Sequence, residues 1–297
     1  MLITYNSAAH LPDLLADLEP LARSGDFRVT AVDNGSQDGT LAVLRTVDWV
    51  RLVQAPENPG YAGGINRARV DGPVGVPLVI LNPDLRIDAD AVRALIAALD
   101  RPGIGITVPT IQDPDGTVYP SLRREPSLLR AVGDALLGSR LGRRPGRFSE
   151  MIRNTGAYPR IDRVAWATGA VLAISADCDR QVGAWDAGRF FLYSEETDYC
   201  RRARDRGFAV VHVPEAVAVH IGAGSGDSVP LQALQAVNRV RYYRKHHRRP
   251  AAALYRAVVM LHALARLGQP GQRRALGVLS GVRSARTLPG GRPGALW

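Results

Sequence analysis

The sequence predicts an α/β protein with a doubly wound, mostly parallel sheet and a helical extension at its C-terminal end. Two patterns in the chain of 297 residues support this fold class. Over residues 1–110, short runs of branched apolar residues alternate with amphipathic segments of helical period, which is typical of parallel strands joined by crossover helices. Polar clusters directly follow several apolar runs, at the carboxyl ends of the predicted strands, where ligands bind in such sheets.

The first half of the chain supplies most of the predicted sheet. We expect strands at residues 2–5, 27–32, 50–54, 77–81 and 104–108, and helices between them at 11–21, 40–47, 61–70 and 89–99. The first strand is short beside the usual five or six residues, so we expect it to be truncated at its start.

The pattern changes after residue 111. Residues 112–163 are rich in Pro, Gly and Arg, and we expect a helix at 127–137 and then a flexible segment at 138–149 that faces an acceptor or a membrane. Further strands are predicted at 164–166, 170–174, 209–213 and 216–219, and helices at 231–243, 251–267 and 272–282. The chain thus divides into a domain at 1–228, with halves at 1–110 and 111–228, and a helical extension at 229–297.

Composition narrows the functional classes. The formal net charge of +10 favours anionic partners, which include nucleic acid, phosphorylated substrates and acidic membranes. Basic and aromatic residues do not interleave along one stretch, so we expect no nucleic-acid binding. No apolar run is long enough to span a bilayer, and no secretory pattern opens the chain. Together with the low cysteine content, these features predict a cytoplasmic protein.

The most informative segment is an acidic one at residues 194–198. It holds Glu195, Glu196 and Asp198, and carboxylates so close together resist joint ionisation unless a cation offsets the repulsion. At least one pKa should therefore rise, which suits a group that exchanges a proton with a substrate. The same residues also fit the first turn of a helix capped by Ser194, because carboxylates are favoured at that end of the helix dipole.

Three polar turns are candidate ligand contacts. Asp33 ends a strand and can accept hydrogen bonds from a pyrimidine base or a ribose, although such turns also commonly join a strand to a helix. Gly60 and Gly63 open a helix, where free backbone N–H groups suit a diphosphate or sugar, and small residues equally suit close packing. Asn82 and Asp84 follow the strongest apolar strand and can hold a divalent cation, or simply form an Asn-Pro turn.

Two further features lie later in the chain. His220 ends a predicted strand before a glycine-rich loop, so it is a candidate metal ligand or phosphate contact as well as an ordinary structural histidine. Trp166 and Thr168 precede a strand and suit the face and hydroxyls of a sugar ring, whereas core packing explains the tryptophan equally well.

Taken in order, six blocks of the sequence resemble the family 2 inverting glycosyltransferases, in particular their bacterial rhamnosyltransferase-like branch. The blocks are residues 4–7, 32–40, 58–66, 82–84, 168–170 and 195–198, and the resemblance covers residues 2–225. It implies the GT-A fold and a hexosyltransferase that uses a nucleotide-diphosphate sugar, dTDP-rhamnose or a UDP-sugar, with Mg²⁺ or Mn²⁺ as cofactor. It also implies a glycan or polyprenyl-linked acceptor and a role in cell-envelope polysaccharide synthesis.

The resemblance assigns a role to each candidate residue. Glu196 is our choice of catalytic base, with Glu195 second. The nucleotide sugar is assigned to Tyr5, Asn6, Asp33, Asn34, Ser36, Gly60, Gly63, Asn66 and Asn82, the acceptor to Trp166, Thr168, Gly169 and Asp198, and the metal to Asp84 and His220. The chain departs from the family pattern twice, because Asn82 begins the metal motif and Glu196 is longer than the usual aspartate.

Two other functions are left open by the sequence. A nucleotidyltransferase that makes sugar nucleotides should carry a Gly-rich loop with Arg and Lys near its N-terminus, and residues 2–12 lack one. A non-catalytic sugar-nucleotide-binding protein is suggested by the short first strand and by Asn82. Residues 242–247, which are aromatic and basic, precede apolar segments and predict either a surface on the inner face of the plasma membrane or a solvated helix pair.

Overall fold

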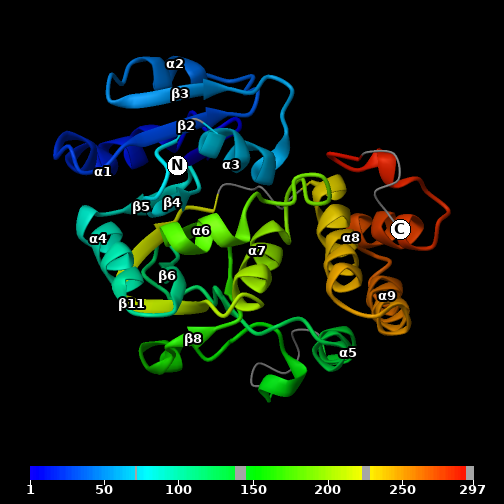
Figure 1. Ribbon diagram of the computed structural model, residues 1–297. Helices are drawn as coiled ribbons and strands as arrows, with labels where there is room; N and C mark the ends of the chain where they lie inside the picture. Colours follow the sequence, from blue (N-terminus) through cyan, green and yellow to red (C-terminus); the bar gives the residue numbers. More distant parts are fainter. Residues whose placement is uncertain (71, 138–144, 223–227, 292–297) are drawn as a thin grey trace.

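The computed structural model describes residues 1–70, 72–137, 145–222 and 228–291. The strands of its large sheet are β1 Leu2–Thr4, β2 Val29–Asp33, β3 Val50–Gln54, β4 Leu78–Leu81, β5 Leu85–Ile87, β6 Ile104–Gln112, β8 Arg163–Val164, β10 Val171–Ile174 and β11 Ala209–His220. They run in the order β3-β2-β1-β4-β10-β6-β11-β5, with β8 paired to β11 (Figure 1). The predicted α/β class is confirmed.

The two halves of the sheet differ in strand direction. The strands β3, β2, β1 and β4 are all parallel, as the alternating pattern predicts. Beyond them, β10 is antiparallel to both β4 and β6, and β5 and β8 are antiparallel to β11, whereas β11 is parallel to β6. The short β5 was not predicted, and the two strands predicted at 209–213 and 216–219 are one strand with a register shift between Val213 and Val217.

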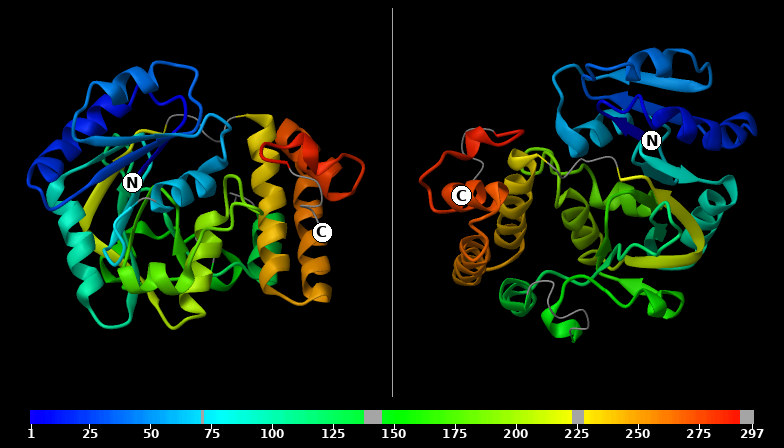
Figure 2. Two further views of the ribbon diagram at one scale, coloured as in Figure 1. Left: turned by 45° about the horizontal axis from the view of Figure 1, so that its top comes forward. Right: turned by 180° about the vertical axis from the view of Figure 1, so that it is seen from behind.

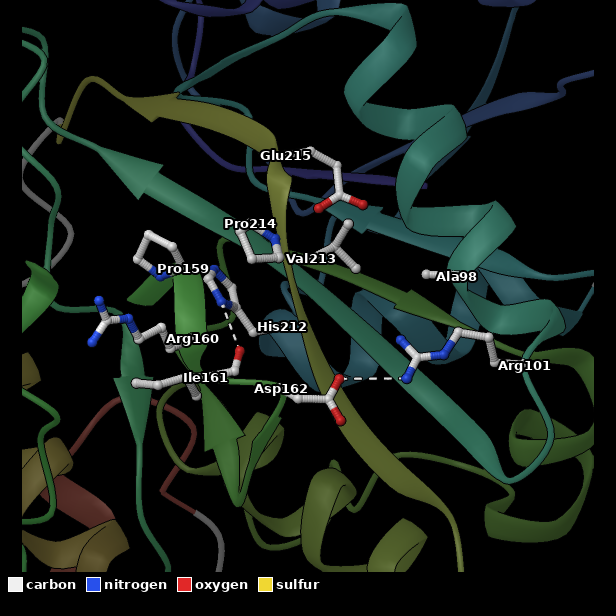
Figure 3. Close-up of a pocket in the computed structure, with 10 residues that line it drawn as sticks. All are labelled: Ala98, Arg101, Pro159, Arg160, Ile161, Asp162, His212, Val213, Pro214 and Glu215. Atoms are coloured by element: carbon white, nitrogen blue, oxygen red, sulfur yellow. Dashed lines mark hydrogen bonds and ion pairs between the residues drawn. The ribbon is translucent and has the colours of Figure 1, made fainter. Parts of the chain in front are cut away.

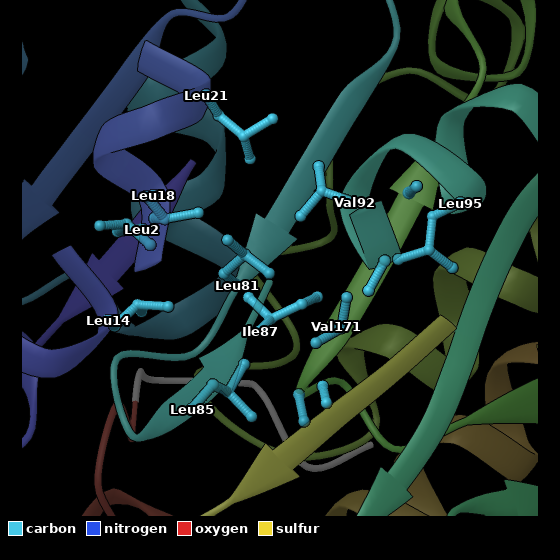
Figure 4. Close-up of a cluster of buried hydrophobic side chains, with 14 of the residues drawn as sticks. Leu2, Leu14, Leu18, Leu21, Leu81, Leu85, Ile87, Val92, Leu95 and Val171 are labelled. Atoms are coloured by element: carbon cyan, nitrogen blue, oxygen red, sulfur yellow. The ribbon is translucent and has the colours of Figure 1, made fainter. Parts of the chain in front are cut away.

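Helices cover both faces of the sheet, which makes it doubly wound. They are α1 Leu11–Arg23, α2 Thr40–Arg45, α3 Gly60–Val70, α4 Ala89–Ala97, α6 Ala176–Val182 and α7 Glu195–Arg204. Successive strand residues point to opposite faces, so Leu2 packs with α1 and α4 while Ile3 packs with α3 and α7. Figure 4 shows part of the first of these cores, in which Leu14 and Leu18 of α1 and Val92 of α4 lie with Leu2 in one apolar cluster.

A third apolar cluster lies beside the sheet domain. It joins α5 Leu128–Leu137 to α8 Val229–His246, α9 Arg249–Leu264 and α10 Pro270–Leu279. Figure 2 shows α8, α9 and α10 grouped on one side of the molecule, with α8 nearest to the sheet domain. Of the segment predicted to be flexible, residues 138–144 lie outside the described residues and Gly146–Phe148 form a 3₁₀ turn. Among the described helices, none is long and apolar enough to cross a membrane.

Candidate active site

The carboxyl ends of β1, β2 and β4 lie at the same edge of the sheet and carry three of the predicted ligand-binding turns. The register pairs Thr4 with Asp33 across β1 and β2, and Leu2 with Leu81 across β1 and β4. Because neighbouring strands are about 4.8 Å apart, the ends of β2 and β4 lie roughly 10 Å from each other. A nucleotide diphosphate can therefore reach from the turn after β2 to the turn after β4.

The turn after β2 is organised by the Asp33 carboxylate, which is 1% exposed. Ser36 donates from its Oγ to Asp33 Oδ1 at 2.5 Å and from its backbone N to Oδ2 at 3.1 Å, while Thr4 Oγ1 donates to Oδ1 at 3.3 Å. Three of the hydrogen bonds that this carboxylate can accept are thus used within the protein. Asp33 fixes the shape of the turn, and base recognition by its side chain stays a prediction.

The loop after β1 is tied to the same turn. Asn6, in the left-handed region with φ 51°, donates from its backbone N to Ser36 Oγ at 2.9 Å and accepts from Gln37 N at 2.8 Å. Beside it, the side chain of Tyr5 is half exposed. An open aromatic ring next to a rigid polar turn is suited to stack on a base.

The two glycines that open α3 are needed for packing. Gly60 has φ +79°, and a Cβ there would overlap the carbonyl oxygen of Phe191, while a Cβ at Gly63 would lie 2.5 Å from Pro59 Cβ. Asn34 fastens this turn to β2, since its Nδ2 donates to the Gly60 carbonyl at 3.1 Å. These contacts explain the small residues without a ligand, so their contact with the nucleotide sugar stays a prediction.

The predicted role of Asn66 is not supported by its surroundings. Its Nδ2 donates to the carbonyl of Trp185 at 2.8 Å, and its Oδ1 accepts from the Trp185 N–H at 2.9 Å. Both ends of the amide are engaged in holding the segment that leads to α7. The structure therefore assigns Asn66 to the fold rather than to the nucleotide sugar.

Asp84 and His220 meet at the edge where a cation was predicted. The antiparallel pairing of β11 with β5 brings His220 opposite Leu85, and His220 Nε2 lies 3.3 Å from Asp84 Oδ2. Asp84 is 7% exposed. Among the described residues, no group of three or more Asp, Glu, His or Cys side chains is arranged to hold a metal ion, so the donor set is small. It fits a cation that takes its remaining ligands from phosphates and water, as Mg²⁺ usually does. The glycine-rich loop at 223–227 lies outside the described residues.

The acidic segment begins α7 in an unusual way. Tyr193 and Ser194 both have left-handed backbones, with φ 70° and 68°, and each non-glycine residue in such a conformation costs about 1–3 kcal/mol. Ser194 occupies the predicted N-cap position, but its side chain makes no capping hydrogen bond. Asn238 on α8 instead stabilises this entry, because its Nδ2 donates to the carbonyls of Leu192 at 2.9 Å and Tyr193 at 3.0 Å. The loop holds the two glutamates in place through contacts from the C-terminal helices.

Glu195 and Glu196 have raised pKa values, as predicted, but burial rather than crowding is the main cause. Glu195 is 5% exposed, and burial together with the charge of Glu196 holds its pKa well above the usual range. Glu196 is half-buried, and burial raises its pKa to about 7 against the opposing charge of Arg123. A carboxyl with this pKa is well matched to accept a proton near neutral pH.

Tyr61, which the sequence did not single out, ties the cation and base regions together. Burial raises its pKa, and the charges of Glu195, Glu196 and Asp84 raise it further, so all three carboxylates lie near this phenol. Its hydroxyl donates to the Gly169 carbonyl at 3.2 Å, and a Cβ at Gly169 would lie 3.5 Å from Glu196 Cβ. The sequence signal that could have identified Tyr61 was its position directly after Gly60, in the turn that opens α3.

One predicted acceptor contact, Trp166, is packed within the protein. Trp166 is 9% exposed, donates from Nε1 to the Arg124 carbonyl at 3.2 Å, and has the Arg123 guanidinium 5.7 Å above its ring. This is the packing alternative that the sequence left open. Trp166 belongs to β9 Trp166–Ala167, which forms a small sheet with β7 Leu122–Arg123. Thr168 and Gly169, by contrast, are half-buried beside Glu196, so acceptor contact stays a prediction for them.

Asp198 is the clearest departure from the predicted site. Its side chain is 1% exposed and pairs with Arg202 at 2.8 Å, Lys245 at 2.7 Å and His246 at 2.8 Å. Burial alone would raise its pKa, but the hydrogen bonds from His246 and Lys245 outweigh burial and lower the pKa to about 2. Asp198 therefore anchors α8 to α7, and no acceptor can reach it without breaking these pairs.

A separate cavity of about 210 Å³ lies near the beginning of β11 (Figure 3). It is lined by His212 and Glu215 of β11 and by Asp162, which pairs with Arg101 at 3.5 Å. Burial lowers the pKa of His212, whose Nε2 lies 3.0 Å from Thr110 Oγ1. This cavity contains none of the residues predicted for the site.

Comparison with known proteins identifies the family. The family model described as glycosyl transferase family 2 matches residues 1–158. N-acetylglucosaminyl-diphospho-decaprenol L-rhamnosyltransferase of Mycobacterium tuberculosis is 34% identical over 252 residues, which are 81% of this chain and 81% of that protein. A low-salt glycan biosynthesis hexosyltransferase of Haloferax volcanii is 26% identical over 226 residues, which are 74% and 66% of the two chains.

Solved structures agree on the fold. The crystal structure of GalNAc-T7 with UDP, GalNAc and Mn²⁺ has a TM-score of 0.63 at 14% identity, covering 96% of this chain and 56% of that one. The mannosyltransferase PcManGT of Pyrobaculum calidifontis, in complex with GDP-Man and Mn²⁺, has a TM-score of 0.52 at 18% identity, covering 97% and 75%. Neither a nucleotidyltransferase nor a non-catalytic binding protein gains support from these comparisons. The chain belongs to the family 2 inverting glycosyltransferases, in their rhamnosyltransferase-like branch, and has the GT-A fold.

Proposed function

We propose that this enzyme transfers a hexose from a nucleotide-diphosphate sugar to a lipid-linked glycan acceptor in cell-envelope polysaccharide synthesis, with Glu196 as the base. The observation that carries the proposal is the pKa of Glu196, raised to about 7, on a half-buried side chain that shares its surroundings with Asp84. The rhamnosyltransferase relative, whose name specifies a diphospho-decaprenol acceptor, supports the choice of acceptor.

The reaction is a single displacement at the anomeric carbon. The Glu196 carboxylate accepts the proton of the acceptor hydroxyl while that oxygen forms its bond to the anomeric carbon from the side opposite the leaving group. The bond from the anomeric carbon to the diphosphate oxygen breaks, and the nucleoside diphosphate leaves with the electron pair. Glu195, whose pKa is raised further, stays protonated and leaves Glu196 free to ionise.

Asp84 and His220 are the residues that would hold a divalent cation, Mg²⁺ or Mn²⁺. When bound, such a cation supplies positive charge that stabilises the departing diphosphate. Both structural neighbours were solved with Mn²⁺, which supports this assignment. We assign the base of the nucleotide to Tyr5 and Asp33, and dTDP-rhamnose is our first choice of donor, with a UDP-sugar second.

We propose that the enzyme works as a domain at residues 1–228 with a helical extension at 229–297, peripherally on the inner face of the plasma membrane. The residues first expected at the membrane do not fit, because Tyr242 and Tyr243 are buried and Lys245 is paired with Asp198. Exposed leucines support a different surface. They are Leu129 and Leu136 on α5 and Leu254, Leu261 and Leu264 on α9, two helices of the same apolar cluster.

The test of the proposed base is Glu196→Gln, assayed by transfer from dTDP-rhamnose to a prenyl-diphospho-N-acetylglucosamine. General-base catalysis contributes about 10²–10⁴-fold, so transfer should fall by that factor. Donor binding, followed by thermal shift with Mn²⁺, should stay within about twofold of the parent because a glutamine keeps the shape of the protonated acid. The exposed Glu215→Gln is the matched control. Transfer at the parent rate by Glu196→Gln would remove this residue from the role.

A further inference from the structure

A second cavity, of about 510 Å³, lies at the far end of α7 from the two glutamates. It is an open cavity lined by residues of β7, β8, the start of α5 and the last turn of α7, and Figure 1 labels β8, α5 and α7. Its charged lining residues are Arg123, Arg124, Arg130, Arg163, Arg204 and Glu125, set against an apolar floor. We call it the arginine pocket.

The single carboxylate among these lining residues is already satisfied. Glu125 accepts from Arg201 Nη1 at 3.0 Å, from the Tyr242 hydroxyl at 2.6 Å and from Arg204 Nη2. Its negative charge is thus balanced by two arginines, one of them outside the pocket. The other lining arginines gain little neutralisation from Glu125.

Arg124 and Arg130 are held by carbonyl groups instead. Arg124 Nη1 lies 3.3 Å from the Ser149 carbonyl, and Arg130 donates to the carbonyls of Glu125 at 2.6 Å and Gly146 at 3.1 Å. Burial and the charge of Arg130 lower the pKa of Arg124. Arg204 Nε is buried without a partner among the described residues. The pocket therefore gathers guanidinium groups whose charge a multiply charged anion would balance.

The pocket is at a suitable distance from the proposed base. Glu196 and Arg204 lie eight residues apart on α7, so a rise of 1.5 Å per residue separates them by about 12 Å. Arg123 lines the pocket and also acts on the charge of Glu196. A single sugar unit, with its reacting hydroxyl at Glu196 and its anomeric oxygen directed along α7, covers part of this separation, and the diphosphate and the long arginine side chains would cover the rest.

We propose that the arginine pocket binds the diphosphate of a prenyl-diphospho-sugar acceptor. This inference rests on the proposed function and names the part of the acceptor that the enzyme recognises. Guanidinium groups match phosphate oxygens in charge and geometry, and the apolar floor suits the first units of the prenyl chain. Arg130 belongs to α5, whose exposed Leu129 and Leu136 continue the apolar surface outward from the pocket.

The first experiment measures binding directly. Geranyl diphosphate, a soluble prenyl diphosphate, is titrated calorimetrically into the full-length enzyme and into Arg124→Gln, Arg130→Gln and Arg163→Gln. Each guanidinium that contacts phosphate should contribute about tenfold in affinity. Arg163 is 73% exposed, so its variant reports on binding without loss of folding. The exposed Arg153→Gln, which lies outside the pocket, is the matched control. Parent affinity in all three pocket variants overturns the proposal.

The second experiment identifies the source of the diphosphate. Arg124→Gln and Arg163→Gln should raise KM for a prenyl-diphospho-sugar about tenfold each, while KM for the same sugar on a neutral alkyl chain and KM for the donor stay unchanged. A rise in donor KM would assign the pocket to the nucleotide instead. Equal losses with both acceptors would also contradict the proposal, as would a loss confined to binding of phosphatidylglycerol vesicles. If no acceptor is used at all, the proposed function fails, and the calorimetric titration still decides whether the pocket binds a prenyl diphosphate.

Discussion

Two carboxylates only two residues apart on α7, Glu196 and Asp198, have opposite surroundings. Glu196 shares the first turn with a second buried acid, and its pKa is raised to about 7. Asp198 is more deeply buried, yet its pKa is lowered to about 2, because Arg202, Lys245 and His246 surround it. Burial is common to both groups, so the position of the cations makes the difference.

The comparison shows how one acidic segment serves two purposes. The cations of α8 reach Asp198 and hold the helix in place, whereas no such pair is present at Glu195 and Glu196 among the described contacts. Asn238 of the same helix α8 fixes the carbonyls just before the two glutamates. The C-terminal helices thus position the proposed base without neutralising it.

The largest effect on stability is expected from Asp198→Asn, which weakens the ion pairs that anchor α8 to α7. Removing one partner of a buried ion pair leaves uncompensated charge and costs about 3–5 kcal/mol, which should appear in urea unfolding of the variant. The matched control is Asp186→Asn, because Asp186 also pairs with Lys245, at 2.8 Å, but its side chain is 29% exposed. The control should lose much less stability. Equal losses in the two variants would contradict the assignment of Asp198 as the anchor.

Lys245 gives an independent check of the same anchor. It is the only lysine in the chain, and it pairs with both Asp186 and Asp198. In a double-mutant cycle of Asp198→Asn with Lys245→Met, contacting residues should show a coupling of about 0.5–3 kcal/mol. A coupling near zero would mean that the two side chains stabilise the protein independently.

The next prediction concerns the contribution of Glu196 to stability as a function of pH. The pKa of Glu196 rises from an ordinary value of 4.5 to about 7 on folding, so the folded state binds more protons than the unfolded state between these values. Stability contributed by this group is complete below about pH 4.5 and is lost as the pH rises towards 7. Glu196→Gln should flatten that part of the stability curve, measured by thermal unfolding from pH 4 to 8.

Catalysis should follow the opposite trend. If Glu196 is the base, as proposed, its carboxylate is the active form, so transfer should increase with pH, with a midpoint near its pKa of about 7. Glu195→Gln copies the protonated neighbour and should leave the midpoint in place. A midpoint that falls towards 4.5 in this variant would show that the two acids share their ionisation, contrary to the proposed division of roles.

Much of the fold was predictable because it depends on local pattern. Strands β1 to β4 and the helices between them follow from apolar periodicity, and so does the position of the polar turns at their carboxyl ends. The antiparallel direction of β10 and the presence of the short β5 were not predictable, since strand direction depends on where the chain returns to the sheet after residues 113–170. The periodicity of a strand carries no information about its neighbours.

The candidate site likewise has features that could be predicted from the sequence and features that could not. The crowding of Glu195 and Glu196 was predictable from their spacing, and both side chains have raised pKa values in the folded protein. The contacts of Asp198, Asn66 and Trp166 were not predictable, because the partner of each lies far away in the sequence. The partners are Lys245, Trp185 and Arg123, at separations of 47, 119 and 43 residues, respectively. Contacts between residues far apart in the sequence give these side chains a structural role instead of a ligand-binding one, and such contacts cannot be read from a single sequence.

The smallest effect is expected at the turn after β2. The Asp33 carboxylate in this turn accepts several hydrogen bonds, as Asp198 does, but none of its donors among the described residues is a cation. Ser36→Ala removes the Oγ that donates to Asp33 and accepts from the Asn6 N–H. A buried hydrogen bond contributes about 1 kcal/mol, so unfolding should become easier by about 1–2 kcal/mol. Under the proposed function the turn positions the donor and takes no part in proton transfer, so KM for the donor should rise while kcat holds. The exposed Ser24→Ala, which also loses a hydroxyl hydrogen bond, is the control. A fall in kcat alone for Ser36→Ala would mean that this turn acts on the reacting groups themselves, and the contrast between a rigid donor turn and an ionisable base would no longer hold.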